Sequence, residues 1–156
     1  MKRGKRLEPV HELALEAERA AARRLADMEH EAVESRARLE QLEVYEREYR
    51  VTLQQRVLDG IAAAGLRDYQ AFLARLGEAV TQQRAVCERA AAGRDAAREQ
   101  WLALTARRRA VGKVIEQAVD ADRRVRERRE QRELDEHALR SFQGLASDDE
   151  VGRGPG

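Results

Sequence analysis

The interior of the chain is interrupted most strongly at Asp59-Gly60-Ile61-Ala62-Ala63-Ala64-Gly65, where two glycines fall within six residues. Glycine is costly inside a helix and readily adopts the left-handed backbone that ends one. We therefore expect Gly60 to cap a preceding helix and residues 59–65 to form a turn. The segments on either side predict two helices, one over about residues 7–58 and one over about 66–142.

The first helix is indicated by an apolar stripe. Pro9 falls where the first turn of a helix tolerates proline. Beyond it, apolar or small residues recur at spacings of three and four, which places them on one helical face. Glu46 interrupts this stripe. Its members are Leu25, Met28, Ala32, Ser35, Leu39, Leu42, Tyr49 and Leu53.

The second helix carries a heptad repeat. If the a positions begin at Leu66 and the d positions at Tyr69, one register continues for eleven heptads, as in a coiled coil. Between residues 66 and 118, 13 of the 16 a and d positions are apolar, but between 122 and 139 only 2 of 6 are. The apolar seam therefore fades in the last part of the helix.

An antiparallel hairpin accounts for this fading. If the chain folds back at residues 59–65, Leu58 faces Leu66 and Leu7 lies opposite about residue 117. Past residue 118 the second helix then has no partner. We predict an all-α fold: a two-helix antiparallel coiled-coil hairpin with a C-terminal helical overhang over 118–142. Residues 1–6 are expected to be a basic disordered arm and 143–156 a disordered tail. Because residues 7–117 satisfy their own seam, the free protein should be a monomer.

The composition excludes several classes of protein. Charged residues make up 38% of the chain, against about 25% in an average domain, and 30 basic residues nearly balance 29 acidic ones. Such a balance does not favour nucleic-acid binding. One cysteine cannot form an intramolecular disulfide, and without a run of 18 apolar residues we expect no membrane span. With 10 Gly and 2 Pro, the chain is poor in the turn residues of an all-β fold.

The sequence contains no recognisable catalytic or metal-binding motif. His11, His30 and His137 form no His-Glu-x-x-His pair, and no glycine-rich phosphate loop occurs. Adjacent helical residues point about 100° apart, so Asp135-Glu136-His137 cannot converge on one atom. Cys87, at an a position, is either a small core residue or a reactive thiol, and core packing is favoured. We expect neither enzyme activity nor a cofactor or metal.

Two surfaces remain as candidates for partner binding. The first is the arginine-rich face of the overhang. It is either a solvated helix face with ion pairs such as Arg126–Glu130 and Arg129–Glu133, or a docking surface. The second lies along the edge of the seam, where an exposed aromatic residue suggests a partner site and ordinary flanking packing is the alternative. Trp101, at an a position, is interpreted as core. The edge stripe consists of Phe72, Leu76, Ala79 and Gln83.

Several strings resemble the FliJ family of the flagellar type III export apparatus, over about residues 7–142. Tyr45–Tyr49 reads YEREY, Tyr69–Gln83 reads YQAFLARLGEAVTQQ, Trp101 follows, and Arg126–Phe142 reads RERREQRELDEHALRSF. The resemblance implies a stalk-like export component that inserts in the hexameric export ATPase, promotes its assembly and activity, and contacts the membrane export gate and late-substrate chaperones. The alternatives are the stalk protein of a virulence type III secretion system and a plain structural coiled-coil scaffold.

The resemblance also implies site residues. The stripe at Phe72, Leu76, Ala79 and Gln83 matches the part of the family that binds the export gate. The stalk ends, about 7–20 and 118–142, are similar to the parts inserted in the ATPase ring. Within the second end, the expected ring contacts are Arg123, Arg126, Arg129, Arg132, Asp135 and Glu136.

Overall fold

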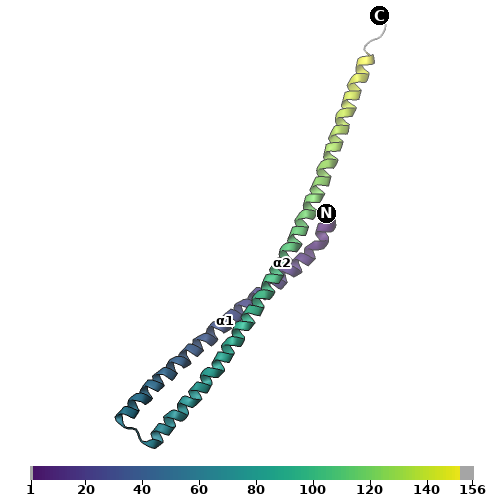
Figure 1. The fold of residues 1–156 in the computed structure, drawn as a ribbon. Coiled ribbons are helices and arrows are strands. Elements are labelled where there is room, and N and C mark those ends of the chain that lie inside the picture. The colour runs from purple at the N-terminus through teal and green to yellow at the C-terminus, as the bar shows by residue number, and fades with distance from the viewer. Residues whose placement is uncertain (1, 152–156) are drawn as a thin grey trace. The chain divides into compact units, whose positions relative to one another are not determined.

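The computed structural model describes residues 2–151, which form two long helices and, within that range, no strand. Helix α1 spans Lys2–Asp59 and helix α2 spans Ala63–Val151. A short turn joins them (Figure 1). Gly60 has a φ of 89°, and its N–H donates to the carbonyl of Val57 at 3.4 Å. The expected left-handed cap at Gly60 is therefore confirmed.

The chain divides into two units, and the helices run antiparallel in each. One unit is Leu15–Arg107, where Tyr49 meets Phe72 near the turn and Met28 lies beside Gly93 further from it. The other unit combines residues 2–14 with 108–151. There His11 lies beside Gly112, and Gly4 beside Val119. The all-α helical-hairpin fold is confirmed.

The predicted seam is buried as expected. In the Leu15–Arg107 unit, every a and d position from Leu66 to Leu104 is buried or half-buried, including Cys87 and Trp101. The buried and half-buried residues of α1 recur at spacings of three and four, so they form the matching face of the seam. Glu46 belongs to this face and is half-buried, and its carboxylate forms an ion pair with Arg50 at 3.0 Å. Much of the buried surface comes from small residues, so the seam is thin. The buried apolar residues of the two units are Ala14, Ala21, Leu76, Val80, Ala90 and Ala97.

In the other unit the seam of α2 ends beside the first turn of α1, which begins at Lys2. The a and d positions from Arg108 to Asp122 are half-buried, whereas Val125 and the later ones through Leu139 are exposed. Residues 123–148 of α2 are exposed throughout. The loss of apolar a and d residues along the sequence therefore coincides with the loss of the partner helix.

The helices extend further than the sequence suggested. Helix α1 begins at Lys2, so the part of the expected arm over 2–6 is helical, because Gly4 is buried against α2. Pro9 consequently lies inside α1 instead of in its first turn. Helix α2 continues to Val151, since no proline interrupts it before Pro155. Met1 and residues 152–156 lie outside the described range.

One expected contact is wrong. Leu58 does not face Leu66 across the seam, because Leu58 is 85% exposed. The three-and-four repeat of α1 passes through Leu53 and then reaches Arg56 and Gly60, so Leu58 points away from α2. Near the turn, the helices instead contact each other through aromatic residues.

Candidate partner-binding surfaces

An aromatic cluster closes the helix pair near the turn. The rings of Tyr49 on α1 and Phe72 on α2 lie 4.5 Å apart, and those of Tyr49 and Tyr69 lie 6.2 Å apart. The guanidinium carbon of Arg56 lies 5.5 Å from the centre of the Tyr69 ring, within the range of a cation–π contact. Tyr45 is exposed one turn before Tyr49. The cluster combines interhelical packing with aromatic surface left open to a partner.

The edge stripe divides into two parts. Phe72 is 39% exposed and Ala79 is half-buried, whereas Leu76 is only 9% exposed and belongs to the core. Gln83 is half-buried, and its Nε2 donates to the carbonyl oxygen of Ser35 on α1 at 2.9 Å. The structure therefore brings the stripe to one edge of the helix pair but turns Leu76 and Gln83 into the seam.

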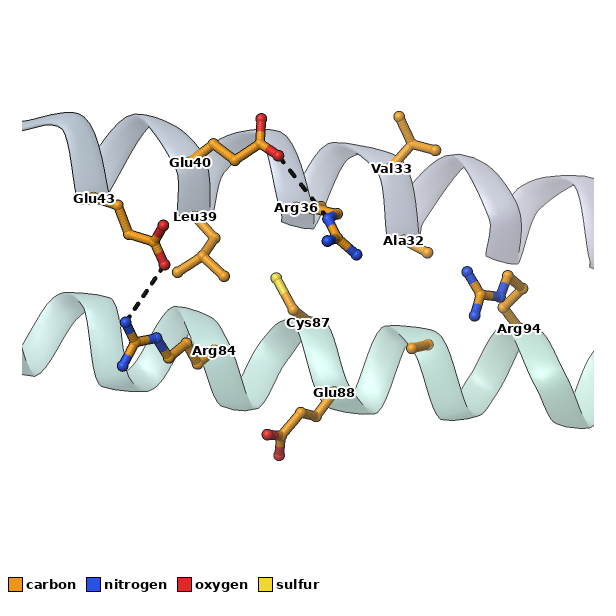
Figure 2. Close-up of a pocket in the computed structure, with 11 residues that line it drawn as sticks. Ala32, Val33, Arg36, Leu39, Glu40, Glu43, Arg84, Cys87, Glu88 and Arg94 are labelled. Atoms are coloured by element: carbon orange, nitrogen blue, oxygen red, sulfur yellow. Dashed lines mark hydrogen bonds and ion pairs between the residues drawn. The ribbon is translucent and has the colours of Figure 1, made fainter.

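A shallow groove of about 450 Å³ lies between the helices midway along the same unit. Figure 2 shows the Cys87 side chain pointing toward α1 near Leu39, with charged residues around it. Arg84 Nη2 lies 3.5 Å from Glu43 Oε1 across the groove, and Arg36 Nε lies 3.9 Å from Glu40 Oε1 along α1. This surface has the charge pairs of an ordinary helix interface and no arrangement of a base with the thiol.

The arginine-rich overhang begins beyond Asp122. Arg123 is held by Asp120 at 3.3 Å and by Glu127 at 3.9 Å. The predicted ion pairs Arg126–Glu130 and Arg129–Glu133 are not formed within the described range.

The other predicted ring contacts on the overhang are exposed as well. Asp135 accepts from Gln131 at 3.2 Å, Glu136 lies 4.0 Å from Arg140, and Arg132 makes no ion pair with any described residue. The overhang therefore presents uncommitted guanidinium groups along an unpartnered helix. These groups are available for carboxylates on another molecule.

Sequence reasoning missed two features that are visible in the structure. The buried contact of Gln83 with the Ser35 backbone joins the helices within the predicted gate site. The meeting of Tyr49 with Phe72 is the second. The hairpin register already placed Tyr49 within about one turn of Phe72, so that signal was present in the sequence.

These observations define the class of protein: an antiparallel helix pair whose second helix extends alone and carries arginines that form no ion pair with the described residues. Among the described residues no group of three His, Cys, Asp or Glu side chains could hold a metal ion. Neither helix, over 2–151, has a stretch long and apolar enough to cross a lipid bilayer.

The family model described as "Flagellar FliJ protein" matches residues 2–146, so the chain belongs to the FliJ family. Members of this family are components of flagellar export. No curated protein and no solved structure matches the chain.

Proposed function

We propose that this chain is a flagellar export component that acts as a central-stalk-like subunit of the export ATPase. In this role it inserts into the hexameric ATPase ring, promotes ring assembly and raises ATPase activity. Membership of the FliJ family supports the export assignment. The antiparallel packing of α1 on α2 within each unit is also the structure expected of a coiled-coil stalk.

The observation that carries the proposal is the unpartnered part of α2. Past Asp122 the seam positions are exposed and mostly charged, so no apolar helix packs there without burying charge. Arg126, Arg129 and Arg132 make no ion pair within the described part of the chain. A ring with acidic loops facing its central opening would complement these groups, and Asp135 and Glu136 would meet basic groups of the ring.

The turn end of the helix pair is proposed to bind the other partners. Phe72, with its partly open ring beside Tyr49, is the anchor that we assign to the cytoplasmic side of the membrane export gate. Ala79 lies at the same edge, whereas Leu76 and Gln83 would support the site from the seam. Late-substrate export chaperones are the third class of partner. We place the protein in the cytoplasm, peripherally at the cytoplasmic face of the cell membrane.

The two alternatives find less support. The match is to a flagellar family model, and it favours the flagellar exporter over a virulence exporter. A plain scaffold would not require uncommitted arginines on an unpartnered helix.

The decisive experiment removes the overhang. A chain that ends at Ala121 keeps nearly all of the seam, so it should keep its helicity. The same chain should no longer stimulate the cognate export ATPase or promote hexamer assembly. Binding to the cytoplasmic domain of the gate protein should persist, which serves as the internal control.

Circular dichroism, ATP hydrolysis rates and analytical ultracentrifugation of the ATPase measure these outcomes. Full stimulation by the truncated chain would show that the overhang is not the ring contact. Failure of the intact chain to bind the ATPase at all would reject the stalk function itself.

A further inference from the structure

A small groove opens beside the seam near the start of α1. It has a volume of about 310 Å³ and lies within the unit formed by residues 2–14 and 108–151. Its apolar surface comes from Gly4 on α1 and from Ile115 and Val119 on α2. Ile115 is half-buried, whereas Val119 is 56% exposed although it adjoins the interface.

The groove exists because α1 has no side chain at one seam position. Gly4 continues the three-and-four repeat of α1 through Leu7 and His11, and it is buried against α2. A Cβ atom built on Gly4 would lie 3.9 Å from Val119 Cγ2, which is an ordinary van der Waals distance. A side chain would therefore fit at this position, and its absence leaves the Val119 methyl groups uncovered.

The rim of the groove is charged, with more basic than acidic groups. Lys5, Arg123 and Arg126 line it together with Glu8 and Asp122. Arg123 is already held by Asp120 and Glu127. Lys5 and Arg126 make no ion pair with any residue of the described range, so both cations are free to meet an added carboxylate.

The groove is also continuous with the α1–α2 interface. Ile115 and Asp122 are consecutive a positions of α2, and the groove follows them alongside the first turns of α1. An apolar side chain from another protein would extend the same seam by one layer. The groove thus has an apolar floor, two cations without ion-pair partners in the described range, and an open end of the seam. Together these features favour a partner segment in which an aliphatic residue is flanked by acidic ones.

We propose that this groove docks such a segment of the export ATPase, with the aliphatic side chain over Val119 and a carboxylate against Lys5 or Arg126. The inference rests on the proposed stalk function and deepens it, because it makes the ring contact a composite of both helices. The arginines of the overhang then attract the acidic segment of the ATPase, and the aliphatic side chain inserted over Val119 fixes the position of that segment.

The test compares two valines of α2 in full-length protein. Val119→Asp replaces the groove floor by a charge that repels an acidic segment. Val114→Asp is the matched control, since Val114 is 44% exposed in the same unit but does not line this groove. Titration calorimetry with the purified cognate export ATPase should give at least about tenfold weaker binding for Val119→Asp, as expected for loss of a central anchor. The control should stay within about twofold of the native protein.

A second variant fills the groove without adding charge. Gly4→Leu should occupy the space over Val119, and leucine has a higher helix propensity than glycine. Weaker ATPase binding with an equal or higher thermal midpoint is the expected result. If both Val119→Asp and Gly4→Leu bind as tightly as the native chain, the groove is not the docking site although the stalk function stands. If the native chain does not bind the ATPase, both proposals are rejected.

Discussion

Phe72 and Leu76 lie one helical turn apart on α2, yet they have different physical roles. Leu76 is a d residue whose side chain is buried between the helices. Phe72 lies beside the seam, where its ring contacts that of Tyr49 and the residue remains 39% exposed. Substituting both residues at once would therefore mix loss of a partner contact with loss of core packing.

Single substitutions separate these roles. Phe72→Ala should weaken binding to the gate protein and cost about 1 kcal/mol of stability, through loss of the ring contact with Tyr49. Leu76→Ala should cost about 2 kcal/mol or more, as buried leucine truncations do. Urea denaturation followed by circular dichroism measures the stabilities, and a pull-down with the gate domain measures the binding. Undiminished gate binding by Phe72→Ala would remove the anchor role from this residue.

Thr105 is a second residue with a specific physical consequence. Its side chain is buried, and its Oγ1 has no hydrogen-bond partner among the described residues. A buried hydroxyl without a partner loses the hydration it has in the unfolded chain. Thr105→Val keeps the shape and removes the hydroxyl, so it should raise the free energy of unfolding by about 1 kcal/mol. A lower thermal midpoint for this variant would show that the hydroxyl finds a partner in solution.

At the scale of the element, α2 has a part that packs on α1 and a part that packs on nothing in the described chain. Through Asp122 its a and d residues pack on α1, and beyond that point every side chain through residue 148 is exposed. An isolated helix is marginal in water without tertiary packing. Side-chain contacts such as those of Arg123 with Asp120 and Glu127 contribute only a few tenths of a kcal/mol each. The exposed part is therefore the segment most readily shaped by a partner.

Charge reversal tests the role of this segment. Changing Arg126, Arg129 and Arg132 to Glu should abolish stimulation of the ATPase, and stimulation by the native chain should fall as salt screens the ion pairs. Reversal of the exposed Arg36, Arg38 and Arg47 on α1 is the matched control, because it changes the net charge by the same amount. Equal losses in the two triple variants would mean that net charge matters and not position.

At the scale of the whole molecule, the antiparallel pairing of α1 with α2 determines the oligomeric state. Through Asp122 the seam of α2 is covered by α1 within both units, so no second copy is needed to bury that part of it. Light scattering at micromolar concentration should give the mass of one chain. A stable dimer would mean that α2 pairs with α2 of another chain, which would contradict the hairpin.

The sequence by itself determined the two helices, the turn between them and the heptad register of the second helix. The heptad repeat from Leu66, the glycine at position 60 and the loss of apolar residues after Ala118 predicted the helices, the turn and the end of the seam. These features are local or periodic, because burial on a helix repeats with the helical period and a left-handed cap favours glycine. The arginines of the overhang were likewise visible as a candidate surface.

Only the tertiary structure decided which side chains of the candidate sites are open to a partner. It placed Leu76 in the core and joined Gln83 to the Ser35 backbone, so Phe72 remains as the exposed anchor. It also made residues 2–6 helical and formed the groove beside Gly4. These outcomes depend on which atoms of one helix meet the other, and the periodicity of a single helix does not contain that information.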